Sequence, residues 1–536
     1  MTSSTGPGRV TGARHWWQDA VVYQVYVRSF SDSNGDGIGD LPGITARLPY
    51  LTDLGVDALW LTPFYRSPMA DHGYDISDQC DVDPIFGTLG DADALLERAH
   101  ALGLRVIVDL VPNHTSDEHR WFQEALAHPG SPYRERFLFR PPGADGGPPN
   151  NWVSVFGGPA WTLDPASGEY FLHLFDSRQP DVNWRHPAVH AEWERILRFW
   201  LDRGVDGFRI DVAHGLYKRA DLADHPPGLV VEDPIFHAST APYAWDQPEV
   251  LDVYHRWREI TEEYDDRVMV GEVFLSELDR VARFVGPKHL HQSFNFPLLA
   301  APLDATTWRN LITASLVAFD VEGASPTWVL SNHDVIRHAT RYGGGDEGRA
   351  RARAATLTLL ALPGSIYLYE GEELGLEQDD LPPQARQDPI WLRSGGTVEG
   401  RDGCRTPVPW NSVPAGHGFT TGRPWLPLGP QAVSRSVEAE RADAGSTWAF
   451  YQRALGLRRG AFVGAVRWLE LGPELLGFAR DHVDGGELIC VLSTGSEQVT
   501  VALPGSEVLL ASRAGTSASA RDVVLPGGAA VWLRRT

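Results

Sequence analysis

The sequence predicts an α/β protein built on a (β/α)8 TIM barrel, with a small domain inserted after the third strand and an antiparallel β-sandwich at the C-terminus. Two observations predict the barrel. Eight short runs of β-branched and aromatic residues recur along the chain, and stretches with the helical spacing of apolar residues separate them. A third observation predicts the sandwich, because helical periodicity stops at about residue 460 and short strand-like runs follow.

The eight expected barrel strands each occupy a short apolar run. They are residues 21–30, 58–65, 105–114, 207–211, 268–273, 293–296, 327–334 and 365–371. Helices are expected between them, for example at residues 44–55, 92–103 and 191–204, and each of these patterns ends in glycine. The carboxyl ends of barrel strands meet at one mouth, so the polar residues that end these strands are expected to form a common site.

Four segments follow from this pattern. Residues 1–114 and 187–460 form the two parts of the barrel, whose last helix is expected within residues 446–460. Residues 115–186 are too many for a simple strand-to-helix loop, and they contain a Gly/Pro-rich stretch at 140–152 and a strand-like run at 169–175. We therefore expect an inserted domain there, and the β-sandwich over residues 461–536.

Composition narrows the class of partner. The chain has 536 residues, 43% of them hydrophobic, and a formal net charge of −23. Such a charge opposes binding to nucleic acid or to anionic lipid, so a small-molecule partner is expected, with no nucleic acid and no membrane. Three cysteines, Cys80, Cys404 and Cys490, are few, odd in number and widely spaced, which favours a reducing compartment. No secretion signal is recognised near the start, so a cytoplasmic location is expected. The expected oligomeric state is a monomer or a homodimer.

The stretch SDSNGDGIGDLPG, residues 31–43, has the oxygen spacing of a loop that binds a hard cation. Its candidate ligands are the side chains of Asp32, Asn34, Asp36 and Asp40 and the backbone carbonyl of Ile38. It is not an EF-hand, because that loop needs a glutamate at its twelfth position and this chain has Gly43 there. Ca²⁺ is expected ahead of Mg²⁺, and the alternative is a turn without an ion. No organic cofactor is expected.

Three carboxylates end separate barrel strands and should converge at the mouth: Asp211, Glu272 and Asp334. Unpaired, they would repel one another unless one held a proton or met a cation. Hydrolysis of a glycosidic bond uses such an arrangement, because one ionised carboxylate attacks the sugar carbon while a protonated one donates to the leaving oxygen.

The sequence neighbours of these carboxylates suggest their roles. Arg209 lies two residues before Asp211 on the same strand face, so it should keep Asp211 ionised as the nucleophile. Glu272 has apolar neighbours and no such partner nearby in sequence, so a raised pKa is expected, as an acid that later acts as base requires. Asp334 would stabilise the positive charge that develops on the sugar ring.

Several motifs resemble a known family. DLVPNH (109–114), GFRIDVAH (207–214), GEVF (271–274) and SNHD (331–334) resemble the four signature regions of the α-amylase superfamily, glycoside hydrolase family 13. Four further segments resemble motifs of its α-glucosidase and oligo-1,6-glucosidase branch: QPDVNW (179–184), DHGYDISD (71–78), GRDGCRTPVPW (400–410) and the loop at 31–40. The similarity runs from about Trp16 to the end of the chain.

The resemblance implies roles for individual residues. It implies Asp211 as nucleophile, Glu272 as acid/base and Asp334 as transition-state stabiliser. It further implies that His114, Arg209 and His333 hold the non-reducing glucose, that Tyr74 stacks on its ring, and that an ion pair between Asp75 and Arg401 closes the pocket after one sugar. Arg405 is the alternative pocket arginine. The family's cation loop matches residues 32–40, which implies a structural ion outside the catalytic centre.

These expectations favour a retaining, exo-acting α-glucosidase that releases terminal glucose from short α-glucosides. Close alternatives are an oligo-1,6-glucosidase and a glucosyl-transferring or isomerising relative such as a trehalose synthase, sucrose isomerase or sucrose hydrolase. Val212 after the nucleophile is associated in this branch with α-1,6 preference, whereas the segment DVAH differs from the DAVP type of trehalose synthases. An alternative of another class is a non-catalytic barrel that acts as a binding partner, similar to the ectodomain of amino-acid transporter heavy chains.

Overall fold

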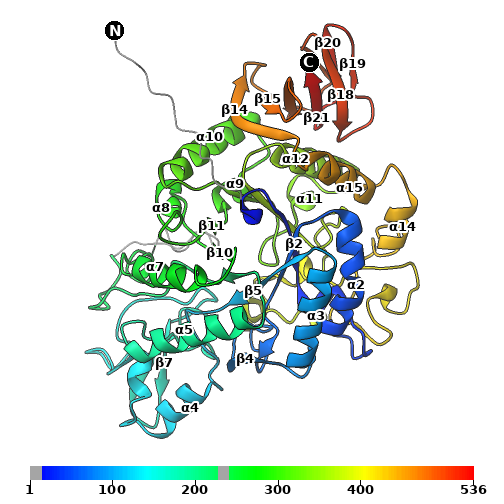
Figure 1. Cartoon of the computed structure of the whole chain (residues 1–536). Helices are drawn as coiled ribbons and strands as arrows, with labels where there is room; N and C mark the ends of the chain where they lie inside the picture. Colours follow the sequence, from blue (N-terminus) through cyan, green and yellow to red (C-terminus); the bar gives the residue numbers. More distant parts are fainter. Residues whose placement is uncertain (1–14, 227–240, 536) are drawn as a thin grey trace, which may run out of the picture.

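The computed structural model describes residues 15–226 and 241–535 (Figure 1). Its centre is an eight-stranded sheet in the order β11-β10-β9-β5-β2-β1-β13-β12, and every neighbouring pair in it is parallel. A parallel bridge between Phe294 and Thr327 brings the two outer strands together, so the sheet forms a nearly closed barrel. The strands are β1 (Val21–Val25), β2 (Ala58–Leu61), β5 (Arg105–Leu110), β9 (Gly207–Ile210), β10 (Val268–Gly271), β11 (Gln292–Ser293), β12 (Thr327–Val329) and β13 (Ser365–Tyr369).

All eight expected strands are present, but each is shorter than its expected run, and in two of them a helix takes over from the strand. The first ends at Val25, and a helical turn, α1 (Val27–Phe30), takes up the rest of the apolar run. The sixth has only two residues, because the Asn295 side chain accepts a hydrogen bond from the Leu298 amide and begins α9 (Phe296–Ala300). Pro297 favours this start, since a helix tolerates proline in its first turn.

Alternate residues of the strands build two cores. In β1, Val21, Tyr23 and Val25 pack outward against the helices, whereas Val22 faces the barrel interior. The interior is filled by apolar side chains from seven of the eight strands or their ends, including Val22, Ala58, Trp60, Ile107, Val270, Phe294, Val329 and Tyr367. The barrel is thus a packed core whose carboxyl end carries the polar residues.

Helices surround the barrel (Figure 1). The longer ones are α2 (Leu41–Leu54), α3 (Leu89–Ala101), α5 (Pro187–Asp202), α7 (Val250–Thr261), α10 (Ala305–Val321), α12 (Gly345–Leu360) and α15 (Thr447–Arg458). Asp40 caps the start of α2 through the Gly43 amide, and Gly55 ends it with φ 98°, a conformation that glycine adopts without strain. The expected helices at 44–55, 92–103, 191–204 and 446–460 are confirmed.

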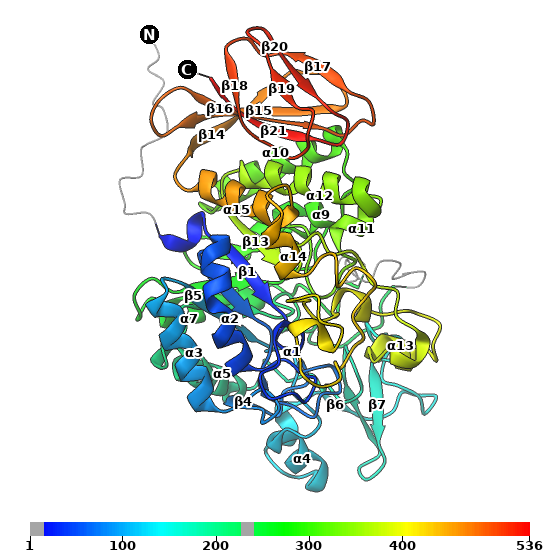
Figure 2. The same cartoon turned by 90° about the vertical axis from the view of Figure 1, so that its right-hand side faces the viewer.

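Between β5 and α5 the chain forms an additional substructure. It contains α4 (Arg120–Ala127) and a three-stranded antiparallel sheet in the order β6-β8-β7, made of β6 (Phe139–Arg140), β7 (Trp161–Asp164) and β8 (Glu169–Leu172). Figures 1 and 2 place it on the side of the molecule opposite the C-terminal strands. An insertion after the third barrel strand is therefore present as expected, while the four domain boundaries remain predictions.

The C-terminal strands form an antiparallel sheet domain. A five-stranded sheet has the order β14-β15-β16-β21-β18, and a three-stranded sheet has the order β17-β20-β19. The strands are β14 (Phe462–Leu469), β15 (Leu475–His482), β16 (Glu487–Ser493), β17 (Val499–Ala502), β18 (Ser506–Ala511), β19 (Ser517–Ala518), β20 (Asp522–Leu525) and β21 (Ala530–Arg535). Both β19 and β20 escaped the sequence analysis, since they have only two and four residues and the segment before Val523 is polar.

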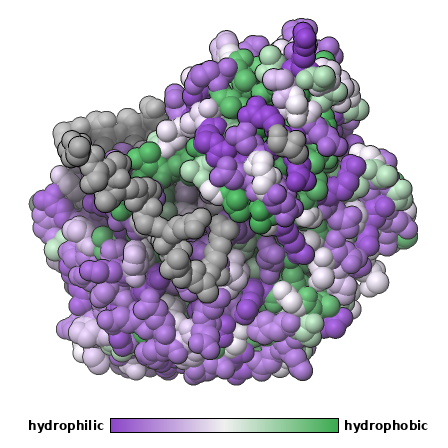
Figure 3. Space-filling view, turned by 45° about the horizontal axis from the view of Figure 1, so that its top comes forward, coloured by the Kyte–Doolittle hydropathy of each residue, from purple (hydrophilic) through white to green (hydrophobic). Residues whose placement is uncertain are grey.

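The outer surface is largely polar. The face in Figure 3 is mostly hydrophilic with smaller hydrophobic areas. Over the described ranges, no helix is both long and apolar enough to cross a membrane. Cys80, Cys404 and Cys490 are free thiols, as their spacing suggested. The residues before His15, including most of the segment inspected for a secretion signal, lie outside the described part of the chain.

Candidate active site

The register of the barrel strands builds the centre of the site. Asp109 on β5 lies directly beside Arg209 on β9, and both face the interior one layer above Ile107. The strand ladder continues beyond β9 and β10, because the Asp211 amide donates to Leu110 and the Glu272 amide donates to Ile210. Asp211 and Glu272 therefore leave adjacent strands at the carboxyl end, as the sequence predicted.

Arg209 holds three carboxylates at once. Its Nη1 donates to Asp109 Oδ1 at 2.8 Å and to Asp211 Oδ1 at 2.7 Å, and its Nη2 donates to Glu272 Oε1. Two expectations are corrected here. Glu272 does have a cationic partner, which sequence distance concealed because Arg209 lies on the neighbouring strand. Arg209 itself is fully buried and lies outside the cavity lining, which disagrees with its predicted contact with the sugar.

Burial sets the protonation of this cluster. It raises the pKa of both Asp211 and Glu272, and the nearby Arg209 opposes the rise in each case. The pKa of Asp109 is likewise raised by burial against the same guanidinium. One cation cannot balance three buried carboxylates, so a proton on one of them is favoured. The Asp211 charge contributes to the raised pKa of Glu272, which therefore depends on the state of Asp211.

The backbone also contributes a hydrogen bond to Glu272. The Val212 amide donates to Glu272 Oε2 at 3.0 Å. Val212 has φ 44°, which a β-branched residue rarely adopts, and its side chain is buried. This strained turn follows Asp211 and directs the amide toward the second carboxylate, as strained backbone at functional sites often does.

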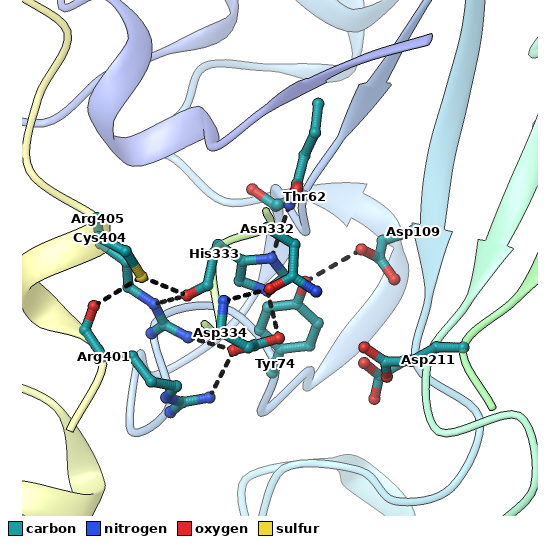
Figure 4. A network of polar contacts seen from close by, with 12 residues as sticks. Thr62, Tyr74, Asp109, Asp211, Asn332, His333, Asp334, Arg401, Cys404 and Arg405 are labelled. Atoms are coloured by element: carbon teal, nitrogen blue, oxygen red, sulfur yellow. Dashed lines mark hydrogen bonds and ion pairs between the residues drawn. The ribbon is translucent and has the colours of Figure 1, made fainter. Parts of the chain in front are cut away.

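The third carboxylate, Asp334, meets two arginines on the opposite wall (Figure 4). Arg401 Nη1 lies 3.0 Å and Arg405 Nη2 2.8 Å from Asp334 Oδ1. Burial would raise the pKa of Asp334, but His333, Arg401 and Arg405 outweigh it and hold that pKa below its usual range. Asp334 is therefore an anion, and both candidate pocket arginines contact it.

The two predicted histidines are neutral at neutral pH. Burial lowers the pKa of His114 to about 4 and that of His333 well below its usual value. Gln24 Nε2 lies 2.7 Å from His333 Nδ1, so the amide donates there and His333 Nε2 carries the proton toward Asp334 Oδ2 at 3.3 Å. The Tyr74 ring stacks on the His333 ring with centroids 5.3 Å apart.

The predicted ion pair between Asp75 and Arg401 is wrong. Arg401 Nη2 pairs instead with Asp71 Oδ1 at 2.8 Å. Asp75 is fully buried away from the cavity, where its carboxylate accepts hydrogen bonds from Ser67 Oγ, the Ala70 amide and the Asp71 amide. The two aspartates lie four residues apart in one loop, and sequence alone does not show which of them faces the pocket.

These groups line one cavity of about 600 Å³, within the usual range for a small-molecule site. Of the residues predicted for the site, Asp211, Glu272, Asp334, Tyr74, His114, His333 and Arg401 line it. The inserted substructure contributes Val155, Phe156 and Phe175, and the segment after β13 contributes Ile390, Arg393 and Val398. Polar groups thus gather at the carboxyl end of the strands, and apolar side chains from two other segments complete the wall.

Comparison with known families agrees with this geometry. Residues 24–463 match the family described as the α-amylase catalytic domain. The chain belongs to glycoside hydrolase family 13. A probable alpha-glucosidase of Rhizobium meliloti is 41% identical over 514 residues, which cover 92% of this chain and 91% of that protein. An oligo-1,6-glucosidase of Parageobacillus thermoglucosidasius is 37% identical, covering 91% and 92%.

A solved structure of this family has nearly the same fold. The alpha-glucosyl transfer enzyme XgtA superposes with a TM-score of 0.90 and 38% sequence identity, over 98% of this chain and 100% of that one. At 38% identity, the comparison supports the family as well as the fold.

The sequence reasoning missed several residues of this family 13 site. Asp71 is described above, and Asp109 was noted only as the end of a strand; its Oδ2 accepts from Trp60 Nε1 at 3.1 Å and Tyr74 Oη at 3.2 Å. Gln179 Nε2 lies 3.2 Å from both Asp71 Oδ2 and His114 Nε2. Asp71 and Gln179 each lie inside a motif that carried the family resemblance, which was the available signal.

The loop at 32–40 lies away from the cavity and is tied to a later segment. Asp32 Oδ2 accepts from the Gly37 amide and from Thr420 Oγ1, and the Trp425 amide donates to the Gly37 carbonyl. Asp36 bonds the Ile38 amide, and Asp40 caps α2. The candidate ligand atoms in this loop are all oxygens, as Ca²⁺ prefers. Within the described ranges, however, no group of three or more Asp, Glu, His or Cys side chains is placed to hold a metal ion. Ca²⁺ at Asp32, Asn34, Asp36, Ile38 and Asp40 stays a prediction.

Proposed function

We propose that this family 13 chain is a retaining, exo-acting α-glucosidase that acts on short oligosaccharides or α-glucosides. The observation that carries the retaining course is the shared guanidinium. Retaining enzymes keep their two carboxyl groups about 5–5.5 Å apart, whereas inverting ones separate them by about 6.5–9.5 Å to admit a water molecule. Because Arg209 holds Asp211 and Glu272 at once, the closer spacing is favoured.

The first step forms a covalent intermediate. Asp211 attacks the anomeric carbon, and the bond to the leaving oxygen breaks as Glu272 transfers its proton to that oxygen. The raised pKa of Glu272 allows it to hold this proton in the free enzyme. The anionic Asp334, neutralised in part by Arg401 and Arg405, faces the ring as positive charge develops there.

The second step releases glucose. Esterification removes the charge of Asp211, and one contribution to the raised pKa of Glu272 disappears with it. Glu272, now a carboxylate, accepts a proton from water as the water oxygen bonds to the anomeric carbon and the ester bond breaks. The Val212 amide stabilises the ionised form of Glu272 in this step.

The exo-acting course rests on the wall around Asp71. We infer that Asp71 and Arg401, together with His114, His333 and Tyr74, bind the hydroxyl groups of one terminal glucose and leave no space for a second sugar on that side. The ion pair between Asp71 and Arg401 supports this reading, because it joins the loop after β2 to the segment after β13 across the cavity lining. Val398, another residue of the lining, is 52% exposed, so we place the open side of the cavity there.

Two related activities remain alternatives. An oligo-1,6-glucosidase is supported by the 37% identity to one and by Val212 after the nucleophile. Glucosyl transfer is supported by the likeness to an alpha-glucosyl transfer enzyme, and it needs only that a sugar replace water in the second step. A non-catalytic barrel is disfavoured because all three carboxylates line one cavity.

Location and partners are proposed from the cysteines and the net charge. A cytoplasmic location is supported by three free thiols. The net charge of −23 disfavours nucleic acid and anionic membrane surfaces as partners. We expect a monomer or a homodimer, and sedimentation velocity distinguishes the two.

The test is a substrate panel. Purified wild type is assayed for glucose release from maltose, isomaltose, sucrose, trehalose and p-nitrophenyl α-glucoside, beside Asp211→Asn. The proposal expects wild-type hydrolysis with the α-anomer as first product by NMR, and loss of hydrolysis in the variant. A β-anomer product would contradict the retaining course, and inactivity of the wild type on every α-glucoside would contradict the enzyme.

A further inference from the structure

We propose that Arg393 is a specificity-determining residue, because it fixes the part of the cavity wall that contacts the leaving group. It thereby governs which aglycone is accepted and whether the glucosyl-enzyme reacts with water or with a sugar acceptor. This inference rests on the proposed function. It concerns a contact between two segments that approach the cavity from different parts of the chain, the inserted substructure and the segment after β13.

Arg393 joins these two segments directly. It ends α13 (Pro389–Arg393), which lies beside the inserted strands in Figure 2. Its Nη1 lies 3.0 Å from Asp176 Oδ2, and its Nη2 donates to the Gly157 carbonyl at 3.0 Å. Both side chains of the ion pair are mostly buried, Arg393 at 24% and Asp176 at 13% exposure, so the contact is a defined part of the cavity wall.

The loop that Arg393 holds has a shape of its own. Gly157 and Gly158 have φ 88° and 77°, conformations that other residues rarely adopt, and they bring the Gly157 carbonyl to the guanidinium. On its other side the loop is fastened to its own substructure, since the Val155 amide donates to Leu174 and Ser154 Oγ donates to Phe175. Val155 and Phe156 are thereby presented to the cavity.

The position of the contact identifies the part of the substrate that it meets. Groups that hold the carboxylates or form the closed end, Asp71, His333 and Arg401, are nearly or mostly buried. The neighbours of Arg393 in the lining, Val398, Gly157 and Gly158, are exposed and mark the open side. A terminal glucose bound at the closed end places its leaving group toward this open side, so the wall near Arg393 meets the leaving group and any incoming acceptor.

The chemistry of this wall suggests how it acts. Val155, Phe156, Ile390 and Val398 offer apolar surface, while the Arg393 guanidinium is occupied by Asp176 and Gly157. Releasing the contact would let the two segments separate and would disorder the acceptor side without altering the carboxylates around Arg209. The effect should therefore grow with the size of the leaving group.

The test uses leaving groups of different size. Wild type, Arg393→Met, Asp176→Asn and the double variant are assayed on α-glucosyl fluoride, maltose and maltotetraose, with transfer products quantified at high maltose. Methionine retains the aliphatic stem of Arg393, and asparagine retains the Asp176 Oδ1 that accepts from the Arg178 amide. The matched control is Arg178→Gln, which breaks an ion pair to Asp117 in the same loop but does not line the cavity.

The expected result is a selective change. In either single variant, the ratio of kcat/KM for maltotetraose to kcat/KM for maltose shifts at least about threefold, and the fraction of glucose transferred to maltose falls. Turnover of α-glucosyl fluoride stays within about twofold of the wild-type value. The double variant should match the single variants, because both remove one interaction. The control should behave as wild type.

Two outcomes overturn the inference. The first is an active variant whose ratio of kcat/KM between substrates and whose transferred fraction are both unchanged. The second is a variant that loses kcat/KM equally on all substrates and unfolds at a lower temperature, which would indicate a purely structural contact. Failure of the proposed function is distinguishable, since the wild type would then hydrolyse none of these compounds.

Discussion

Substituting Asp71 and Asp75 separately by asparagine tests which aspartate binds the sugar. The family resemblance pointed to Asp75, whereas the structure places Asp71 against Arg401 and in the cavity lining. The two changes are matched in chemistry and lie four residues apart, so any difference between them reflects their different surroundings.

For Asp71→Asn, the loss should be catalytic. A hydrogen bond to a charged group contributes about 1.5–3 kcal/mol. At about 1.4 kcal/mol for each factor of ten, kcat/KM should fall about 10- to 150-fold. Stability should be kept or increased, because burial raises the pKa of Asp71 to about 6, which means that the folded protein holds this charge at a cost near neutral pH.

For Asp75→Asn, the loss should be structural. Both carboxylate oxygens of Asp75 accept backbone amides, from Ala70 at 2.7 Å and from Asp71 at 2.9 Å. An asparagine side chain must turn its NH₂ toward one of these buried donors, which costs about 1–3 kcal/mol of unfolding free energy. Activity of the folded protein should fall much less than for Asp71→Asn.

The assay combines kcat/KM on p-nitrophenyl α-glucoside with thermal and urea unfolding of both variants. The reasoning is refuted if Asp75→Asn loses activity at unchanged stability while Asp71→Asn remains fully active.

Three further predictions concern protons and metal. Activity should fall at low pH as Asp211 takes up a proton and at high pH as Glu272 loses one. Since burial raises both pKa values, a pH–rate profile of kcat/KM should show an acid limb well above the pKa of a free aspartate. An acid limb near pH 4 would contradict this. Stability should also decline on acidification, because the pKa of His114 is lowered to about 4 from an unfolded value of about 6.5 and the unfolded chain therefore binds more protons between these two pH values. Urea unfolding should show that His114 contributes a loss of up to about 3 kcal/mol, and this loss should be absent in His114→Gln. If the loop at 32–40 binds Ca²⁺, chelation should lower the unfolding temperature of the wild type but not of Asp32→Ala, whereas elemental analysis without a bound divalent ion would reject the site.

Much of the fold could be predicted because its patterns are local. The barrel strands are short β-branched runs buried on both faces, and the glycines at 55 and 204 mark helix ends with positive φ. What failed depends on neighbours in space or on a single competing side chain. Asn295 and Pro297 began a helix at the end of a run that resembled a strand, and β19 and β20 have only two and four residues, too few to form a pattern.

For the site, the sequence identified the strand ends that meet but not how their side chains share partners. Asp211, Glu272 and Asp334 were found because barrel topology brings strand ends to one mouth. That Arg209 also holds Glu272 follows from the pairing of β9 with β10, which sequence spacing does not show. Likewise, Asp71 and Asp75 share one loop, and only the backbone turn that contains Met69 and His72 at positive φ determines which carboxylate faces inward.

The most direct test of the central claim is to capture the sugar on Asp211. In Glu272→Gln, α-glucosyl fluoride can still react, because fluoride leaves without a proton donor, but the base that activates water is absent. Mass spectrometry of the digested protein should then find one glucosyl group on the peptide that contains Asp211 and none in Asp211→Asn. An unmodified peptide under turnover conditions, or a glucosyl group on another residue, would contradict the account.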